Sequence, residues 1–210
     1  MITLAILAIT IGVSVLAFSD GNVRNKLIFI PYDVKRYGRY HTIVSHALLH
    51  ADYGHLAVNM FVFYNFGNYL ETFFVGSYGP IKGSFAFVAV YLGGIVAGAM
   101  PSMIKQTENP GYAAVGASAG VSAILFSFIF INPLLELQLI LIPIPFKAFI
   151  FGFLYLLLET YLNKRGGTRV AHDAHIFGAI FGIILTAAVD INLFLDFFSQ
   201  LNTYFKSFWS

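Results

Sequence analysis

The sequence predicts an all-α membrane protein with a bundle of six membrane-crossing helices. Hydrophobic residues make up 58% of the chain and charged residues only 10%, against roughly 25% charged in a soluble domain. The mean hydropathy of +0.77 also indicates lipid as the solvent. Apolar runs close to the length of about 20 residues that crosses a bilayer recur six times. They lack the alternation typical of a membrane β-barrel.

The six predicted helices are separated by segments that favour turns. We predict helices over 2–18, 54–75, 84–104, 114–132, 146–162 and 174–191. Each of the first five is followed by Gly, Asn or Pro in a short polar segment. The first run has no basic residues before it and no small-x-small cleavage pattern after it, so we expect a retained helix rather than a signal peptide. The chain is interpreted as a single domain, 1–210.

Two segments are expected to lie at the membrane interface. Residues 19–53 are too polar to cross the bilayer and too apolar to leave it. The tail, 192–210, is rich in Phe and is interpreted as an interfacial end rather than a seventh span. The net charge of +2 comes without a basic block, so nucleic acid is not indicated as a partner. The absence of Cys excludes disulfides, thiolate chemistry and Cys-ligated metals.

Polar residues are costly inside a membrane helix, and four of them fall at corresponding places. His55 and Asn59 open the second predicted helix, Ser118 the fourth and His175 the sixth. Because consecutive spans alternate in direction, these helix starts lie on the same side of the membrane. The four side chains are therefore expected at similar depth. His55 and Asn59 are four residues apart and share one helical face.

Glycines near the serine and the histidine predict that their helices approach closely, since small residues let helix backbones meet in lipid. Two pairs have GxxxG spacing: Gly116 with Gly120, and Gly178 with Gly182. Close approach would bring the Ser118 hydroxyl within hydrogen-bond reach of His175, about 2.6–3.2 Å.

This arrangement indicates nucleophilic catalysis. Ser118 is the candidate nucleophile and His175 its base. His55, Asn59 and the backbone N–H of Ser118 are candidate donors to an oxyanion. Gly116 and Ala117, directly before the serine, are the candidate substrate-binding residues. Asp173 points to a different side from His175, and no other carboxylate is expected nearby, so we predict a Ser–His dyad rather than a triad.

The same residues also fit other interpretations. The Gly-Ala-Ser-Ala-Gly segment alone fits a close-packed helix face, His175 can bridge helices, and His55 with Asn59 can be a structural pair. The coincidence of side and depth across three helices disfavours these. The histidines are also potential metal ligands, but there is no HExxH pattern, and acidic ligands are not expected in the helix interiors. We predict no metal and no cofactor. A small-solute transporter would need broken helices at mid-membrane.

Four motifs together resemble the rhomboid family of intramembrane serine proteases. They are Ser-His-Ala-Leu-Leu-His at 45–50, His-Leu-Ala-Val-Asn at 55–59, Gly-Ala-Ser-Ala-Gly at 116–120 and Ala-His-Ile-Phe-Gly-Ala-Ile-Phe-Gly at 174–182. The resemblance implies an endopeptidase that cuts transmembrane segments of membrane proteins. It implies Ser118 as nucleophile, His175 as base, and His55 with Asn59 as the oxyanion hole. The implied partners are transmembrane substrates and the lipid bilayer. The alternative is an inactive rhomboid-like protein that binds or retains membrane clients.

The resemblance also covers residues outside the four candidates, and two positions, Gly38 and Ser122, differ from the family pattern. His46 and His50 match loop histidines that are structural rather than catalytic. Arg39 matches the arginine of a Trp-Arg pair, but Gly38 precedes it. Ser122 stands where the family often has an aromatic residue against the base, so we expect an aromatic from the second or fifth helix to hold His175.

Charge and resemblance disagree on orientation. Nine of the twelve Lys and Arg residues, Arg169 among them, lie in loops on the side of the candidate site, which by the positive-inside rule would face the cytoplasm. Bacterial rhomboids of six helices imply a multi-pass inner-membrane protein whose site opens outward. We adopt the orientation that the resemblance implies.

Overall fold

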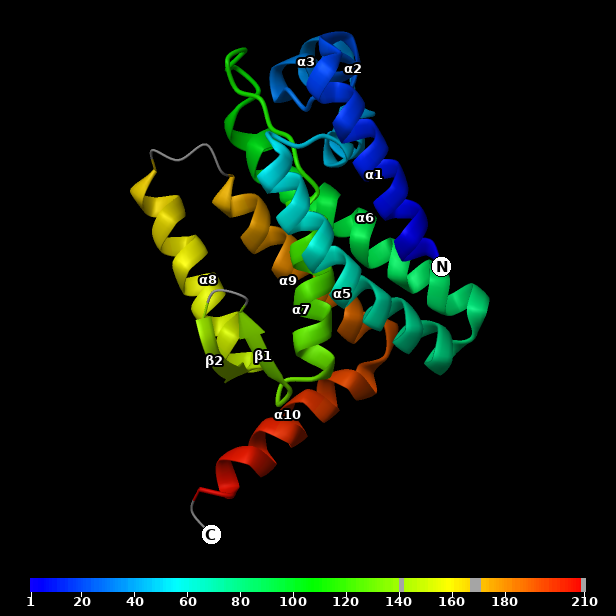
Figure 1. Cartoon of the computed structure of the whole chain (residues 1–210). Helices are drawn as coiled ribbons and strands as arrows, with labels where there is room; N and C mark the ends of the chain where they lie inside the picture. Colours follow the sequence, from blue (N-terminus) through cyan, green and yellow to red (C-terminus); the bar gives the residue numbers. More distant parts are fainter. Residues whose placement is uncertain (140–141, 167–170, 209–210) are drawn as a thin grey trace.

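The computed structural model describes residues 1–139, 142–166 and 171–208, and the regular structure in this part of the chain is helical apart from one hairpin and one isolated β-bridge (Figure 1). The longer helices are α1 (Ile2–Ser19), α5 (Tyr53–Tyr78), α6 (Pro80–Lys105), α7 (Ser118–Ile131), α8 (Ala148–Arg165), α9 (His172–Val189) and α10 (Ile191–Lys206). Short helices α2 (Gly21–Leu27), α3 (Pro31–Tyr37), α4 (Thr42–Ser45) and the 3₁₀ turn η1 (His46–Leu48) fill the segment between α1 and α5. Arg169 and residue 167, where a turn was predicted, lie outside the described residues.

The hairpin joins α7 to α8 and was not predicted. Its strands, β1 (Glu136–Leu139) and β2 (Ile142–Lys147), are antiparallel, and Glu136 pairs with Lys147. The predicted fifth helix, which began at 146, therefore starts two residues late, at Ala148. A two-stranded ribbon satisfies the backbone of this connection outside the helices.

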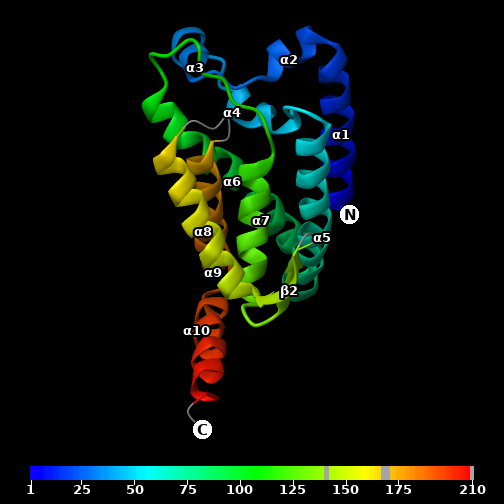
Figure 2. The ribbon, with the colours of Figure 1, turned by 60° about the vertical axis from the view of Figure 1, so that its left-hand side comes forward.

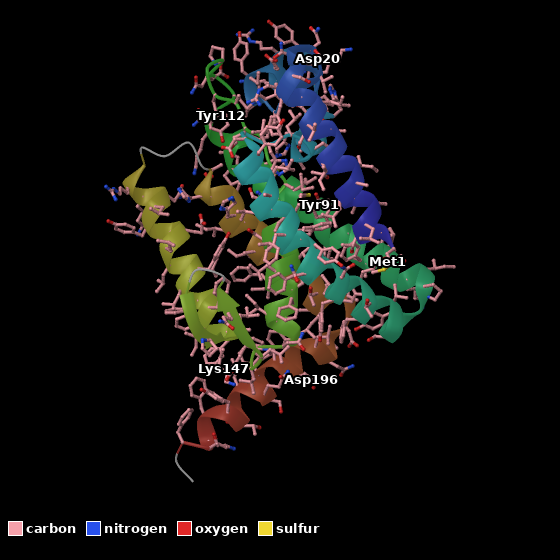
Figure 3. All side chains as sticks on the ribbon, in the orientation of Figure 1. Met1, Asp20, Tyr91, Tyr112, Lys147 and Asp196 are labelled. Atoms are coloured by element: carbon pink, nitrogen blue, oxygen red, sulfur yellow. The ribbon has the colours of Figure 1, made fainter. Side chains whose placement is uncertain are left out.

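The helices that carry the candidate residues run in one direction. α5, α7 and α9 descend in Figures 1 and 2, whereas α6 and α8 ascend between them. Their starts are thus at the same end of the molecule, as predicted. Asp20 and Tyr112 mark this end, Lys147 and Asp196 mark the opposite end, and Tyr91 lies between them (Figure 3).

Three helices of the described part of the chain are long and apolar enough to cross a membrane: α1, α6 and α9. α7 is apolar but has only 14 residues. α5 and α8 are long but are not among the three. The described part of the chain thus has three candidate membrane-spanning helices, and the count of six spans stays a prediction.

The predicted start of the fourth helix at 114 is wrong, because the segment before Ser118 pairs with a distant part of the chain. Ala114 and Phe29 form an isolated antiparallel bridge, with N···O distances of 2.9 and 3.2 Å. Gly116 follows with φ +124°, a backbone conformation that side-chain-bearing residues rarely adopt. The helix can therefore begin only after Gly116, and Ser118 is its first residue.

The sixth predicted helix, 174–191, also has different ends. α9 begins at His172 and ends at Val189, and α10 begins at Ile191. Asp190 separates the two, because its carboxylate accepts from the Asn192 N–H and caps α10. The tail is therefore mainly helical, and the structure buries none of the α10 residues. Its interfacial location stays a prediction.

α7 lies at the centre of the bundle, in very close contact with α9. A Cβ added to Gly178 would lie 2.2 Å from the Ala119 carbonyl oxygen, and one added to Gly182 would lie 2.2 Å from the Ala123 oxygen. These distances leave no room for any side chain. A polar contact adds to the packing, because Thr186 on α9 donates to Ser127 on α7 at 2.8 Å.

α6 covers another side of α7 through small residues as well. A Cβ on Gly94 would lie 2.4 Å from the Cβ of Ala123, and one on Gly98 would lie 2.4 Å from the Cβ of Ala119. Gly120 also faces α6, since a Cβ there would lie 2.8 Å from the Tyr91 ring. Gly116 and Gly120 therefore do not form one face toward α9. The predicted closeness to α9 comes from Gly178 and Gly182.

The segment between α1 and α5 is anchored by Arg39. Its guanidinium lies 2.9 Å from the Asp33 carboxylate and donates to the Lys26 carbonyl at 3.0 Å. Arg39 thus ties the region together although Gly38 precedes it. In the same segment His46 is buried and its Nδ1 lies 2.9 Å from the Thr42 carbonyl. Burial lowers the pKa of His46 to about 4.

We predict that Gly178→Ala lowers the thermal midpoint in detergent, because its methyl group must displace the Ala119 carbonyl. Overpacking of this kind costs about 1–3 kcal/mol. Gly12→Ala is the matched control, since nothing lies within 4 Å of a Cβ there. Alanine is the better helix former by roughly 1 kcal/mol, so the control should match or exceed the parent. A Gly178→Ala protein as stable as the control would contradict the close contact.

We predict that acidification weakens the fold through His46. An unfolded histidine takes up its proton near pH 6.5, whereas the folded one does so only near pH 4. The stabilisation is therefore complete above pH 6.5 and is lost as the pH falls from 6.5 to 4, by roughly 3 kcal/mol in all. The fall in thermal midpoint between pH 7 and pH 5 should be smaller in His46→Gln. His41→Gln changes an exposed histidine and should leave the fall in thermal midpoint as large as in the parent protein. An equal fall in His41→Gln and His46→Gln would refute the assignment of this pH dependence to His46.

Candidate active site

Ser118 and His175 meet between the first turns of α7 and α9. The Nε2 atom of His175 lies 2.8 Å from the Oγ atom of Ser118. The approach follows from the helix contact, because Ser118 directly precedes Ala119 and His175 lies one turn before Gly178. The His175 side chain is 14% exposed. The pair predicted from the sequence is therefore hydrogen-bonded and shielded, but it is not sealed.

His55 lies beside the serine and faces it across Gly116. A Cβ on Gly116 would lie 3.4 Å from His55 Nε2 and 3.7 Å from Ser118 Oγ. The other ring nitrogen of His55, Nδ1, accepts from the Ala51 N–H at 3.4 Å. A neutral imidazole with Nδ1 as acceptor carries its proton on Nε2. His55 thus presents an N–H donor on the side of Ser118.

Asn59 lies one turn after His55 on α5 and is 7% exposed. Its amide nitrogen donates to the His55 carbonyl at 2.9 Å. An amide nitrogen has two hydrogens, and this bond uses one of them. Ser118 adds a backbone donor, because the first N–H groups of a helix have no partner inside that helix. The three predicted oxyanion donors are thus chemically able to donate.

His50 packs against His55. Its ring packs edge-on against that of His55 at a centroid distance of 5.1 Å. On its other side, His50 Nδ1 lies 2.9 Å from Ser14 Oγ, and that hydroxyl donates to the Leu48 carbonyl at 2.7 Å. Burial lowers the pKa of His50 to about 4, so its ring is neutral at physiological pH. These contacts fit the structural role expected of His50.

The two candidate substrate-binding residues are buried. Ala117 is 0% exposed, so its side chain has no surface to offer to a substrate. Gly116 is also buried and donates its N–H to the His46 carbonyl at 3.1 Å. Because it has no side chain, Gly116 leaves the space between His55 and Ser118 unfilled. Of the two, only Gly116 borders the reactive atoms.

The prediction that no carboxylate lies near His175 is wrong. Glu159 on α8 places its Oε1 atom 3.1 Å from His175 Nδ1, the ring nitrogen that does not meet Ser118. The distance is that of an ion pair, although the ring N–H is not aligned on the oxygen as a hydrogen bond requires. Asp173 pairs with Lys105 at 3.0 Å, away from His175 as expected.

Glu159 also contacts His172, one turn before His175 on α9. Its second oxygen, Oε2, lies 2.6 Å from His172 Nδ1. The candidate ligand atoms of these three residues all lie within 4.8 Å of one another, and a histidine–histidine–carboxylate set is chemically able to hold a divalent metal. The expectation that helix interiors lack acidic ligands therefore fails at Glu159.

α8 supplies an aromatic side chain as well. The hydroxyl of Tyr155, one turn before Glu159, lies 3.1 Å from Ser122 Oγ. The fifth predicted helix thus supplies an aromatic partner to Ser122. Among the described residues, however, the ring that lies against His175 is that of His172, edge-on at 6.2 Å. The ring against His175 thus comes from its own helix and not, as we expected, from an aromatic residue of the second or fifth predicted helix.

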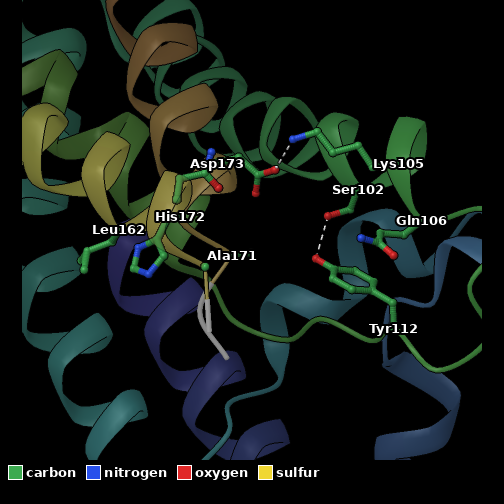
Figure 4. A pocket seen from close by; sticks show the side chains of 10 residues that line it. Ser102, Lys105, Gln106, Tyr112, Leu162, Ala171, His172 and Asp173 are labelled. Atoms are coloured by element: carbon green, nitrogen blue, oxygen red, sulfur yellow. Dashed lines mark hydrogen bonds and ion pairs between the residues drawn. The ribbon is translucent and has the colours of Figure 1, made fainter. Parts of the chain in front are cut away.

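A cavity of about 180 Å³ opens beside these residues, between α6, α8 and the start of α9. His172 lines it, together with the Lys105–Asp173 ion pair and the Ser102–Tyr112 hydrogen bond (Figure 4). Burial raises the pKa of Tyr112, so its hydroxyl stays protonated. The cavity has room for water. Its lining residue His172 contacts both Glu159 and His175.

Comparisons with known proteins identify the family of the chain. The family model described as "Rhomboid domain" matches residues 37–190. The "RHOMBOID-like protein 12, mitochondrial" of Arabidopsis thaliana is 28% identical over 171 residues, which cover 76% of this chain and 49% of that protein. The chain thus spans about half the length of that curated relative. Because the family match extends over most of the chain, including all four candidate residues, this membrane protein belongs to the rhomboid family.

Proposed function

We propose that the protein is a serine-type intramembrane endopeptidase that cuts transmembrane segments of other membrane proteins. The observation that carries this proposal is the 2.8 Å contact between Ser118 Oγ and His175 Nε2. A serine hydroxyl is a weak nucleophile alone and needs an adjacent base. The family usually has this activity, and this chain keeps both residues at bonding distance.

The proposed reaction proceeds through an acyl-enzyme. Ser118 Oγ attacks the scissile carbonyl carbon while His175 Nε2 takes the hydroxyl proton. The carbonyl oxygen becomes an oxyanion, and His55 Nε2–H, the second Asn59 amide hydrogen and the Ser118 N–H are placed to bind it. His175 then gives its proton to the leaving amine. Water attacks the ester by the same steps and restores Ser118.

The location of the site supports transmembrane segments as the substrate class. The pair lies in the first turns of two helices, so a scissile bond must come to the end of the bundle that carries Asp20 and Tyr112. A peptide that is helical in lipid has its carbonyls bonded within the helix, so it must unwind locally before attack. Substrates with helix-breaking residues near the cut should be preferred. Outward opening from an inner membrane remains our expected orientation.

The rival proposal is an inactive rhomboid-like protein that binds or retains membrane clients. Such a protein has no need of a nucleophile held against a base. The contacts of Ser118 and His175, together with donors on the opposite side of the serine, favour the enzyme. Loss of activity without loss of folding in the variants below distinguishes the two.

We predict that Ser118→Ala abolishes cleavage of a transmembrane substrate in detergent and labelling by a fluorophosphonate. His175→Ala should likewise abolish labelling, because the hydroxyl loses its base. Ser122→Ala is the control, since Ser122 lies one turn further along α7 and bonds to Tyr155. It should still be labelled. Labelling or cleavage that persists in Ser118→Ala would exclude this serine as the nucleophile.

We predict that Asn59→Ala lowers kcat about 10²-fold with a small change in KM, as expected for one oxyanion donor. Asn65→Ala is the matched control on the same helix. Asn65 donates to the Phe61 carbonyl at 2.7 Å, just as Asn59 donates to His55, but it is exposed. An equal loss of kcat in the two variants would show that Asn59 only stabilises its own helix.

A further inference from the structure

The carboxylate of Glu159 lies between two histidines of α9. Oε2 contacts His172 Nδ1 at 2.6 Å and Oε1 contacts His175 Nδ1 at 3.1 Å. The Glu159 side chain is 10% exposed and the His172 side chain 7%. An ionised carboxylate accepts hydrogen bonds only, so it favours a proton on each Nδ1 that faces it.

A proton on Nδ1 decides what His175 can do at Nε2. In a neutral imidazole, Nδ1–H leaves a lone pair on Nε2. That lone pair faces the Ser118 hydroxyl and can take its proton. The opposite tautomer would present an N–H to Ser118 and could not act as a base. The carboxylate also lies close to the positive charge that His175 acquires during attack, and a shielded site weakens that attraction far less than water would.

We propose that Glu159 is a positioning residue that makes the pair a Ser118–His175–Glu159 triad, with His172 holding the carboxylate in place. This inference rests on the proposed function. In this role Glu159 acts through His175 and not directly on the substrate or the serine. The short His172 contact fixes one oxygen, and the other is thereby directed at His175. The imperfect alignment of the second contact is common before substrate binds, because catalytic hydrogen bonds tighten in the complex.

The alternative is a purely structural tie between α8 and α9. The contact with His172 alone would provide such a tie. A structural tie would affect stability and leave the tautomer of His175 unchanged. A positioning role predicts that the tautomer and kcat change together.

The test is Glu159→Gln in the full-length protein. The amide keeps the size of the carboxylate but has one accepting oxygen for two Nδ1–H donors, so it satisfies only one histidine. Because His172 is held more tightly, the amide NH₂ should face His175 and favour its wrong tautomer. We expect kcat to fall 10- to 100-fold with KM within twofold. The ¹⁵N signal of His175 Nδ1, assigned with His175→Gln, should move toward the unprotonated position.

Glu71→Gln is the matched control. Glu71 is a second buried carboxylate that joins two helices, since it accepts from the Ile2 and Thr3 N–H groups of α1 at 2.7 and 2.9 Å. Its replacement should lower stability but leave kcat and the His175 signal unchanged. Unchanged kcat in Glu159→Gln, an unmoved ¹⁵N signal, or an equal loss of kcat in Glu71→Gln would each overturn the inference. A parent protein without Ser118-dependent cleavage would instead refute the proposed function, and the ¹⁵N shift would still report on Glu159.

Discussion

The candidate site depends on the contact between the backbones of α7 and α9. Gly178 and Gly182 lie directly against the carbonyls of Ala119 and Ala123, where even a methyl group would be 2.2 Å from oxygen. Lipid provides little hydrophobic driving force for helix association, so such packing carries much of the stability. Ser118 precedes Ala119 by one position, and His175 precedes Gly178 by one turn. Their 2.8 Å contact is therefore fixed by the same packing.

The sequence predicted this contact well because two independent patterns pointed to it. Helix direction placed the polar residues at one end, and small residues marked where backbones approach. The structure bears out both, but it divides the glycines differently. Gly178 and Gly182 face α7, whereas Gly120 faces Tyr91 of α6. Gly116 is not helical at all, because the preceding Ala114 pairs with Phe29, a contact between distant segments that local patterns do not contain.

Glu159 shows what sequence patterns leave open. An ionisable residue in an apolar run was itself a signal, since such residues in membrane helices are rarely without function. Its partner was not predictable, because α8 is apolar on nearly every side around Glu159 and its sequence does not fix how the helix is rotated. Without that rotation, Glu159 could face lipid, α7 or α9. The hairpin between α7 and α8 was missed for a related reason, as an apolar strand and an apolar helix look alike over so few residues.

The two histidines beside Ser118 have different partners at Nδ1, and these partners suit them to opposite proposed roles. His55 Nδ1 accepts from the Ala51 N–H, so its Nε2 is a donor toward the serine. His175 Nδ1 faces the Glu159 carboxylate, so in our proposal its Nε2 is an acceptor. In our proposal, a histidine thus serves as oxyanion donor on one side of Ser118 and another histidine serves as base on the other side. In a site shielded from bulk water, each ring is held by a partner on its far side, and in our proposal that partner also sets the tautomer of the ring before substrate arrives.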